Sequence, residues 1–348
     1  MRFQLLLIVA LVGLSHAASL KSYNVALEDV AVSGLSAGGF MAVQMHVAYS
    51  EQIKGSAVFA GGPFFCAQGM LDTALTTCMS SPSTLSVSSL AEKTSGFAQA
   101  GHIDALENLK DSKVYVYSGE DDTVVNPGVV KGTADMFKQY GADVTSEFNI
   151  DSEHCYPTID FGNPCTKLGS PYISACQYSG AHNSLNVLYK NLKPATSQVA
   201  ANLFEFDQSD FYNSSVNISF GPTGYVYVPT ACQKGDKCRL HIAFHGCQQT
   251  IASIGTEFIT KIGINQIAEA NNLVVLYPQV EKSYYAPSNP EACFDWWGYT
   301  TPGDGPLENS PQYVYKSAPQ MAAVWKMAQA IAGAKSDSAF LPVDGAYQ

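Results

Sequence analysis

Ser36 stands at the centre of the pentapeptide Gly34-Leu35-Ser36-Ala37-Gly38, where a serine can act as a nucleophile. An apolar, strand-like run from Asp29 to Ser33 leads into the pentapeptide, and a helix-compatible run from Phe40 to Ala48 leaves it. At a sharp turn between a strand and a helix, glycines avoid the clashes that Cβ atoms would cause, so the serine hydroxyl stands exposed above the sheet. The pattern by itself also fits an ordinary Ser/Gly turn. We therefore treat Ser36 as a candidate nucleophile and look for its partners.

A candidate acid follows the next strand but one. The strand-like run from Lys113 to Ser118 is followed by Gly-Glu-Asp-Asp, which places carboxylates just past a strand end. We predict Asp122 as the acid of a catalytic triad and keep Asp121 as the alternative. A purely structural role is also open, because these carboxylates fit a turn that caps a helix starting near Pro127.

A candidate general base follows the strand after that. The strand-like run from Val144 to Ile150 is followed by His154. A histidine in this place can take the proton of Ser36 and return it to the leaving group, while a carboxylate holds the ring in the correct tautomer. The order Ser36, Asp122, His154, each after its own strand, is the order of the triad in an α/β hydrolase. That order gives His154 its weight among the seven histidines.

Acyl transfer also needs an oxyanion hole. One N–H group comes from the residue after the serine, here Ala37, and another comes from a His-Gly loop that follows an earlier strand. A strand-like run from Leu240 to Phe244 does lead into His245-Gly246, but it comes after the predicted triad instead of before it. The match is therefore either accidental or a sign that the chain is circularly permuted.

Permutation explains more of the sequence. The predicted nucleophile strand begins only about ten residues into the mature chain, and the chain ends after a helix-compatible run from Pro319 to Ile331, which would normally feed that strand. Exchanging two halves, about 18–200 and 201–348, restores a conventional order of hairpin, His-Gly strand, helix, strand, helix and elbow. Ends that lie close together at the surface make such an exchange physically easy.

Strand-like and helix-compatible runs alternate along the chain, which predicts an α/β fold with a mainly parallel central sheet, flanked by helices, in a single domain. One antiparallel hairpin is predicted where the run Tyr225–Val228 precedes Pro229 and a turn between Cys232 and Cys238. A Ser-rich segment, Ser80–Ser89, fits a loop. Further strands are expected at Ser56–Ala60, Gly224–Pro229, Arg239–Phe244 and Leu273–Tyr277, and helices at Gly39–Tyr49, Val129–Tyr140, Gly255–Asn271 and Pro319–Ile331.

Residues 1–17 read as a secretory signal peptide, because Arg2 precedes an apolar core and Ser15-His16-Ala17 fits a cleavage site. We therefore predict a secreted, extracellular protein whose mature part, 18–348, is one catalytic domain. The sequons at Asn213 and Asn217 predict a glycoprotein. No later run is long enough for a membrane anchor.

Nine cysteines fit an oxidising compartment. Cys232 and Cys238 bracket a turn and would close a short staple, and Cys66 could pair with Cys78 near the predicted nucleophile. Because nine is odd, one thiol must stay free or pair with another molecule if the other eight pair internally. The rest of the connectivity cannot be deduced from sequence.

The net charge of the chain excludes some classes of binding partner. The chain has 19 basic and 30 acidic residues, so the mature chain without Arg2 carries about 12 net negative charges. Nucleic acid and anionic membranes are therefore disfavoured, and we expect a monomer. A zinc site is also disfavoured, because His241 and His245 lie on a strand-like run, where their rings would stand about 13 Å apart.

Five motifs are together far more specific than any one of them. They are Gly34-Leu35-Ser36-Ala37-Gly38-Gly39, His154-Cys155-Tyr156-Pro157-Thr158, Ser170-Pro171-Tyr172-Ile173, His245-Gly246-Cys247-Gln248-Gln249 and Cys293-Phe294-Asp295-Trp296-Trp297-Gly298-Tyr299. In this combination nearly the whole mature chain resembles the circularly permuted, secreted poly(3-hydroxybutyrate) depolymerases and their esterase relatives. The resemblance implies a serine esterase with the triad Ser36, Asp122 and His154, and with the N–H groups of Ala37 and Cys247 as oxyanion donors.

In that family a tryptophan lines the cleft for the acyl chain, and the pair Trp296-Trp297 is similar to it. Adjacent residues on an extended segment face opposite sides, so one tryptophan can belong to the core and the other to the cleft. A purely structural role also fits, since large aromatic side chains are usually placed for their buried area.

The resemblance implies hydrolysis of poly(3-hydroxybutyrate) or short hydroxyalkanoate esters through an acyl-Ser36 intermediate, with no metal or organic cofactor. A carboxylesterase for feruloyl or acetyl esters of polysaccharide is the alternative among enzymes, because the same groups serve any acyl transfer. A hydrolase-fold protein that binds without catalysis is the alternative from another class, although such a protein would not need Ser36, Asp122 and His154 together. Many secreted depolymerases carry a polymer-binding domain after a linker; the notable departure is that no such segment is recognised in this chain, so polymer and soluble ester both stay open as substrates.

Overall fold

A computed structural model of the protein describes residues 19–302 and 310–334. The predicted signal peptide therefore lies outside the described residues. The strands are β1 (Val30–Leu35), β2 (Ile53–Phe59), β3 (Lys113–Tyr117), β4 (Asp143–Glu147), β5 (Tyr156–Thr158), β6 (Asn163–Pro164), β7 (Ile173–Ala175), β8 (Leu203–Asp207), β9 (Thr223–Tyr227), β10 (Arg239–Phe244) and β11 (Leu273–Tyr277).

Helices connect most of these strands. The α-helices are α1 (Ala37–Ala48), α2 (Leu71–Leu75), α3 (Val87–Gln99), α4 (Pro127–Gln139), α5 (Gly180–Tyr189), α6 (Thr230–Gln233), α7 (Ile251–Ile254), α8 (Glu257–Lys261), α9 (Ile264–Asn271) and α10 (Pro319–Ile331). Short 3₁₀ helices are η1 (Pro82–Thr84), η2 (Leu106–Leu109), η3 (Ala200–Asn202), η4 (Gln208–Phe211) and η5 (Pro311–Val314).

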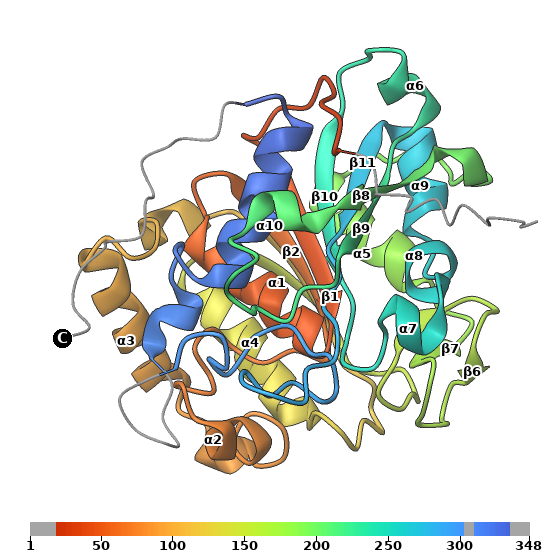
Figure 1. Cartoon of the computed structure of the whole chain (residues 1–348). Coiled ribbons are helices and arrows are strands. Elements are labelled where there is room, and N and C mark those ends of the chain that lie inside the picture. The colour runs from red at the N-terminus through yellow and green to blue at the C-terminus, as the bar shows by residue number, and fades with distance from the viewer. Residues whose placement is uncertain (1–18, 303–309, 335–348) are drawn as a thin grey trace, which may run out of the picture.

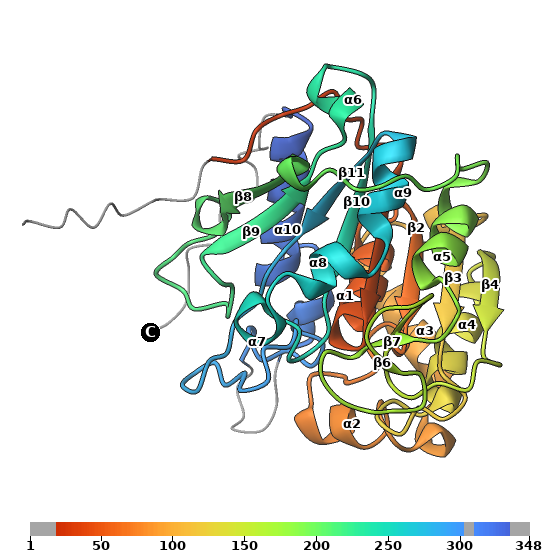
Figure 2. The same cartoon turned by 90° about the vertical axis from the view of Figure 1, so that its right-hand side faces the viewer.

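Eight of the described strands form one sheet in the order β4-β3-β2-β1-β10-β11-β9-β8 (Figure 2). The pairs from β4 to β11 are parallel, and β9 pairs antiparallel with both β11 and β8. Helices α1, α3, α4 and α10 cover one face, and α5, α8 and α9 cover the other (Figure 1). The predicted mainly parallel α/β sheet with flanking helices is confirmed.

The centre of the sheet is apolar on both faces. Every residue of β1 is buried, as expected for a strand that helices cover on both sides. In contrast, the edge strand β4 has the polar sequence Asp-Val-Thr-Ser-Glu and no buried residue, which protects an open edge from pairing with another chain. Because β1, β2, β3 and β10 are parallel, the carboxyl ends of β1, β3 and β10 lie at the same edge of the sheet.

The predicted hairpin between the run Tyr225–Val228 and the strand that follows it is wrong. The antiparallel strand exists as β9, but its partners are β8 and β11. In the sheet β11 lies between β9 and β10, and the chain that joins β9 to β10 holds α6. The strand β8, which makes the real hairpin with β9, was not predicted.

Two helix predictions also need correction. The predicted helix Gly255–Asn271 is broken into α8 and α9, because Gly263 adopts φ 92° and stops the first helix. The predicted Ser-rich loop ends earlier than expected, since the Ser86 side chain accepts a hydrogen bond from Ser89 N–H and begins α3. Helices α3 and α5 were not predicted.

The two ends of the described chain lie side by side. The Tyr23 N–H donates to the Ile331 carbonyl at 2.7 Å. A Cβ atom on Gly333 would lie 3.4 Å from Ser22 Cβ, which is van der Waals contact. The end of α10 therefore meets the segment that leads into β1.

Candidate active site

Ser36 occupies the turn between β1 and α1. Its backbone angles are φ 57° and ψ −123°, a region that residues other than glycine rarely adopt and that is enriched at functional sites. Two hydrogen bonds hold the turn: Ser36 N–H donates to Phe59 O at 2.8 Å, and Phe40 N–H donates to Ser36 O at 2.9 Å. Ser36 thus sits directly before the N-terminus of α1, in the strand-turn-helix geometry that the pentapeptide predicted.

The elbow lies against the loop that follows β10. A Cβ atom on Gly38 would come within 2.3 Å of Phe244 O and 2.5 Å of His245 O, so only glycine allows the first turn of α1 to approach this closely. A Cβ atom on Gly246 would lie 3.4 Å from Ser36 Cβ. The His-Gly loop, although Gly246 follows Ser36 by 210 residues in the sequence, therefore touches the elbow.

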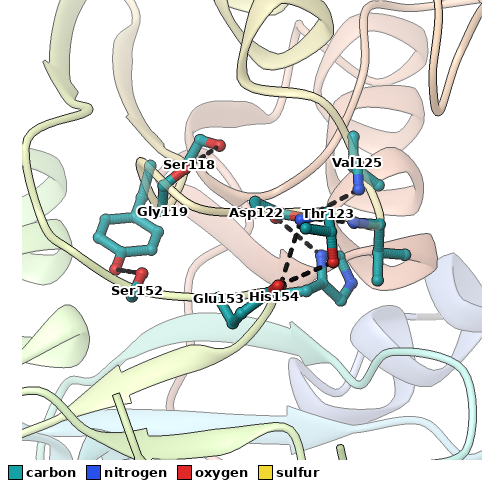
Figure 3. A network of polar contacts seen from close by, with 10 residues as sticks. Ser118, Gly119, Asp122, Thr123, Val125, Ser152, Glu153 and His154 are labelled. Carbon is teal, nitrogen blue, oxygen red and sulfur yellow. Dashed lines mark hydrogen bonds and ion pairs between the residues drawn. The ribbon is translucent and has the colours of Figure 1, made fainter. Parts of the chain in front are cut away.

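Asp122 and His154 form a buried pair (Figure 3). His154 Nδ1 lies 2.8 Å from Asp122 Oδ2, and both residues are almost fully buried. The other carboxylate oxygen, Oδ1, accepts hydrogen bonds from the N–H groups of Val124 and Val125 at 2.9 and 2.8 Å. These bonds hold the carboxylate in the orientation that aims Oδ2 at the His154 ring. The alternative acid, Asp121, is exposed to solvent.

A second carboxylate ties the two loops of this pair together. Glu153 accepts hydrogen bonds from the N–H and hydroxyl of Thr123 and from the His154 N–H, at 3.1, 2.8 and 3.0 Å. Gly119 makes the approach possible, because a Cβ there would lie 2.0 Å from Ser152 O. Because β4 ends at Glu147, His154 lies further beyond the strand than predicted, on a loop that Glu153 anchors.

Ser36 and His154 line a cleft with a volume of about 480 Å³. Its walls are mostly apolar, and they come from segments far apart in the sequence. Besides Ser36 and His154 the lining includes Leu35, Phe40, Leu71, Leu75, Met79, Val124, Val125, Leu168, Tyr172, Gly246, Cys247, Gln248, Gln249, Ser288, Asn289, Pro290, Glu291, Cys293, Trp296 and Trp297.

The two tryptophans have different surroundings. Trp296 is buried and stacks on Phe40, with ring centroids 4.2 Å apart, and Trp297 is half-buried. The alternation of an extended segment predicted one core and one cleft side chain, yet both line the cleft. The segment is a loop wrapped around the Asp295 carboxylate, which accepts from the N–H groups of Gly298, Tyr299 and Thr300.

Among the described residues four disulfides and one free thiol account for all nine cysteines. The predicted pairs Cys66–Cys78 and Cys232–Cys238 are confirmed. The unpredicted pairs are Cys165–Cys176 and Cys247–Cys293, and the free thiol is Cys155. Burial raises the Cys155 pKa to about 11, so this thiol stays protonated at neutral pH and is a poor nucleophile.

His241 and His245, which we considered as zinc ligands, are part of the core. His241 Nε2 lies 2.7 Å from Ser33 Oγ, and His245 Nδ1 lies 2.7 Å from the Gly246 carbonyl. Burial lowers the pKa of His241 to about 3 and that of His245 to about 4, so both rings are neutral at physiological pH.

Several residues around the cleft were not assigned a role from the sequence. The Tyr172 ring lies against His154, with centroids 6.5 Å apart, and Leu71, Leu75 and Met79 form a wall. The motif around Tyr172 was noted in the sequence, but the wall had no motif. Its side chains come from short helical turns held by Cys66–Cys78, and nothing in their spacing indicated a cleft.

Comparison with known proteins places the chain in a family. No family model matches it. It is 36% identical over 302 residues to a polyhydroxybutyrate depolymerase of Talaromyces funiculosus, covering 81% of this chain and 86% of that protein. The chain belongs to the polyhydroxybutyrate (PHB) depolymerase family. It is also 41% identical over 324 residues to a poly(3-hydroxybutyrate) depolymerase of Delftia acidovorans, covering 91% of this chain but only 62% of the length of that relative.

Solved structures of the PHB depolymerase family share the fold. The crystal structure of a PHB depolymerase from Penicillium funiculosum matches with a TM-score of 0.79 and 32% identity, over 91% of this chain and 99% of that one. A PHB depolymerase complexed with an R3HB trimer matches with a TM-score of 0.80 at the same identity and coverage. The predicted resemblance to this family and its α/β-hydrolase fold are confirmed. Among the described residues no helix is long and apolar enough to cross a membrane.

Proposed function

We propose that the chain is a serine esterase that hydrolyses poly(3-hydroxybutyrate) and its short oligomers. The observation that carries the proposal is the meeting of Ser36 with the buried Asp122–His154 pair at one apolar cleft. The kinship supports the substrate class, because the relatives are depolymerases of hydroxyalkanoate polyesters and one of the similar structures holds an R3HB trimer. Esters of polysaccharide and binding without catalysis are not favoured.

In the first step His154 Nε2 takes the proton of Ser36 Oγ as the oxygen attacks the ester carbonyl carbon. The Asp122 carboxylate accepts the His154 Nδ1–H, which fixes the tautomer and stabilises the imidazolium. The carbonyl oxygen becomes an anion, and we assign its two hydrogen-bond donors to the N–H groups of Ala37 and Cys247. Collapse of this intermediate breaks the ester bond, and the leaving alcohol takes the proton from His154.

In the second step water attacks the acyl-Ser36 carbonyl carbon. His154 accepts one water proton, the oxyanion forms again at the same two donors, and collapse returns the proton to Ser36 Oγ as the 3-hydroxy acid leaves. Ser36, His154, Asp122 and water therefore account for each nucleophilic attack and each proton transfer of the cycle, so the mechanism requires no metal or organic cofactor. Trp296 and Trp297 would bind the acyl chain.

Exposed apolar side chains at the cleft support action on a solid polymer. Leu71, Leu75 and Leu168 line the cleft and are 48, 52 and 42% exposed. Tyr284 and Tyr285 are 70 and 86% exposed just before the segment that forms the cleft wall from Ser288. Such a patch can adsorb to an apolar surface.

We also propose that residues 18–348 form one secreted, glycosylated, monomeric domain. Four disulfides fit an oxidising compartment, and Asn213 and Asn217 are exposed. A circular permutation accounts for the order of elements. If residues 201–348 are placed before residues 18–200, the chain runs through the hairpin β8–β9, then β10, α9, β11 and α10, and then reaches the elbow between β1 and α1. The adjacency of Tyr23 and Ile331 supports it.

The function is tested by offering p-nitrophenyl butyrate, 3-hydroxybutyrate oligomers and a polymer film to the wild type and to Ser36→Ala. We expect the wild type to hydrolyse all three and the variant to lose activity by at least about 10³-fold, because removal of any triad member leaves only the oxyanion hole and binding. Equally slow release of product from all three substrates by both proteins would refute the proposed esterase function.

The polymer is tested separately with the double variant Tyr284→Ser/Tyr285→Ser. We expect slower release from the film and unchanged kcat and KM on p-nitrophenyl butyrate, since adsorption precedes catalysis only on the solid. Hydrolysis of soluble esters with an intact film in the wild type would leave the mechanism standing and remove the polymer as substrate. Light scattering after size-exclusion chromatography checks the monomer.

A further inference from the structure

Two side chains hold the backbone of Gly246 from opposite directions. The Gly246 N–H donates to Gln249 Oε1 at 2.7 Å. The Gly246 carbonyl lies 2.7 Å from His245 Nδ1 and also accepts from the Gln249 N–H at 3.3 Å. His245 and Gln249 are almost completely buried. Both peptide groups of Gly246 are therefore fixed by bonds shielded from water.

The bond to the Gly246 carbonyl also sets the direction of the next N–H. The peptide between Gly246 and Cys247 is trans, so its C=O and N–H groups point in opposite directions. Because the carbonyl points at the His245 ring, the Cys247 N–H points away from that ring. Gly246 and Cys247 line the cleft beside Ser36. Among the described residues no acceptor for the Cys247 N–H is found, which leaves this donor free.

The His245 ring is itself fixed in one tautomer. The Val280 N–H donates to His245 Nε2 at 3.4 Å, so Nε2 is the acceptor and Nδ1 carries the proton. Burial lowers the His245 pKa to about 4, and the ring stays neutral. A neutral ring with its proton on Nδ1 can only donate to the Gly246 carbonyl.

Gln249 links this loop to the other side of the cleft. Its Nε2 donates to the carbonyls of Pro171 and Tyr172 at 2.8 and 3.3 Å, and the Tyr172 ring lies against His154. One buried amide thus joins the oxyanion loop to the segment that packs on the general base.

We propose that Gln249 and His245 are positioning residues that aim the Cys247 N–H at the oxyanion. The inference rests on the proposed esterase function. Loss of either side chain frees the Gly246 peptides to rotate, so the donor is no longer held in place when charge develops on the substrate oxygen. The ground-state ester needs this donor much less, and turnover should therefore suffer more than substrate binding.

Gln208 offers a matched control. It is also fully buried, its Oε1 accepts from the Gln279 N–H at 2.9 Å, and its Nε2 donates to the carbonyls of Gly221 and Gln279 at 2.7 and 2.8 Å. It thus makes the same three kinds of bond as Gln249, but it does not line the cleft. A Gln→Met change at both positions removes equivalent bonds.

The experiment measures kcat and KM of Gln249→Met and Gln208→Met on p-nitrophenyl butyrate. Active sites are counted by the p-nitrophenolate released when Ser36 Oγ is phosphorylated to completion by diethyl p-nitrophenyl phosphate. A trifluoromethyl ketone with a butyl chain serves as oxyanion probe, because Ser36 Oγ adds to its carbonyl carbon and the proton passes to His154. The urea midpoint gives the stability of each variant.

We expect Gln249→Met to lower kcat per site by roughly 10- to 100-fold, less than complete removal of an oxyanion donor, with KM within about twofold. The ketone should bind more weakly by a similar factor. Gln208→Met should lose stability and keep kcat per site. A Gln249→Met protein with unchanged kcat and ketone affinity would overturn the inference, while an active Ser36→Ala would overturn the esterase itself.

A second pair keeps the inference testable if Gln249→Met does not fold. His245→Asn retains an N–H donor close to the place of Nδ1, and His245→Leu does not. We expect His245→Asn to recover at least about tenfold of the kcat per site that His245→Leu loses. Equal kcat per site in the two variants would contradict a positioning role.

Discussion

The two halves of the sheet contribute different kinds of groups to the cleft. The half before residue 200 carries Ser36, Asp122 and His154, the groups to which we assign bond making and proton transfer. The half after residue 200 carries the Gly246–Cys247 loop and the pair Trp296-Trp297. These groups would bind and orient the substrate without forming or breaking a bond. Hydrogen bonds of the Asp122 and Glu153 carboxylates hold the triad loops of the first half. The Cys247–Cys293 disulfide and the Asp295 carboxylate hold the cleft loops of the second half. Damage should therefore be severe in the first half and graded in the second.

The largest effect is expected from Asp122→Asn. A neutral amide does not stabilise the imidazolium as the carboxylate does, and its NH2 group can donate to His154 Nδ1 and so favour the wrong tautomer. The kcat should therefore fall roughly 10³- to 10⁴-fold. Steady-state kinetics on p-nitrophenyl butyrate measures it. Asp121→Asn is the matched control, since that side chain is exposed, and its kcat should stay within about twofold. The reverse result would move the acid to Asp121.

A smaller effect is expected from Cys247→Ser/Cys293→Ser. The pair closes a loop with a sequence separation of 46, so its loss should lower the free energy of unfolding by about 4 kcal/mol. Because it also braces the oxyanion loop, kcat should fall roughly tenfold. Urea unfolding measures the loss of stability, and steady-state kinetics measures the loss of kcat.

Cys232→Ser/Cys238→Ser is the control for this prediction. That pair has a sequence separation of 6 and lies away from the cleft, so the double variant should lose about 2 kcal/mol of stability and no turnover. If both double variants keep full kcat, the second half needs no covalent brace.

The tryptophans should separate substrate binding from stability. Trp297→Ala should raise KM for hydroxybutyrate oligomers about tenfold, because it removes apolar contact area from a half-buried cleft side chain. Trp296→Ala should lower the free energy of unfolding by about 3 to 5 kcal/mol, since that ring is buried against Phe40. Kinetics and urea unfolding on each variant decide this, and equal KM changes would argue that both rings serve the substrate alike.

The buried histidines of both halves should change the stability of the fold with pH and leave the turnover of the folded molecule nearly unchanged. Burial lowers the pKa of His46 and His241 to about 3 and of His245 to about 4, below the value of about 6.5 in an unfolded chain. Between these values the unfolded state binds more protons, so the stability they contribute is complete above pH 6.5 and is lost as pH falls toward 4. Each adds a slope of up to about 1.4 kcal/mol per pH unit.

His46→Gln isolates the contribution of one ring. Urea unfolding between pH 4.5 and 7 should show a shallower rise for this variant than for the wild type, with the two curves parallel above pH 6.5. Curves that stay parallel down to pH 4.5 would mean that His46 is not buried in a neutral form.

Some features were predictable from the sequence because they depend on local chemistry. The elbow around Ser36, the strands of the parallel sheet, and the closures Cys66–Cys78 and Cys232–Cys238 all involve residues near one another in the chain. Asp122 was predicted as the partner of His154, but the contacts of Glu153 and the close approach at Gly119 that hold the two loops together were not, because no local pattern reveals them. The partner of Cys247 lies 46 residues away, and β8 is a half-exposed strand without a clear alternation.

The contact between β1 and β10 has a cost during synthesis. Ser33 and His241 touch at the centre of the sheet although 208 residues separate them. At about 5 to 20 residues per second, β1 must wait roughly 10 to 40 s for β10 to be made. Throughout that interval one edge of the buried strand β1 has no partner, a condition that invites aggregation. Since the Tyr23 N–H donates to the Ile331 carbonyl, a chain joined between these two segments and opened in the exposed loop near residue 195 would shorten the wait to about half.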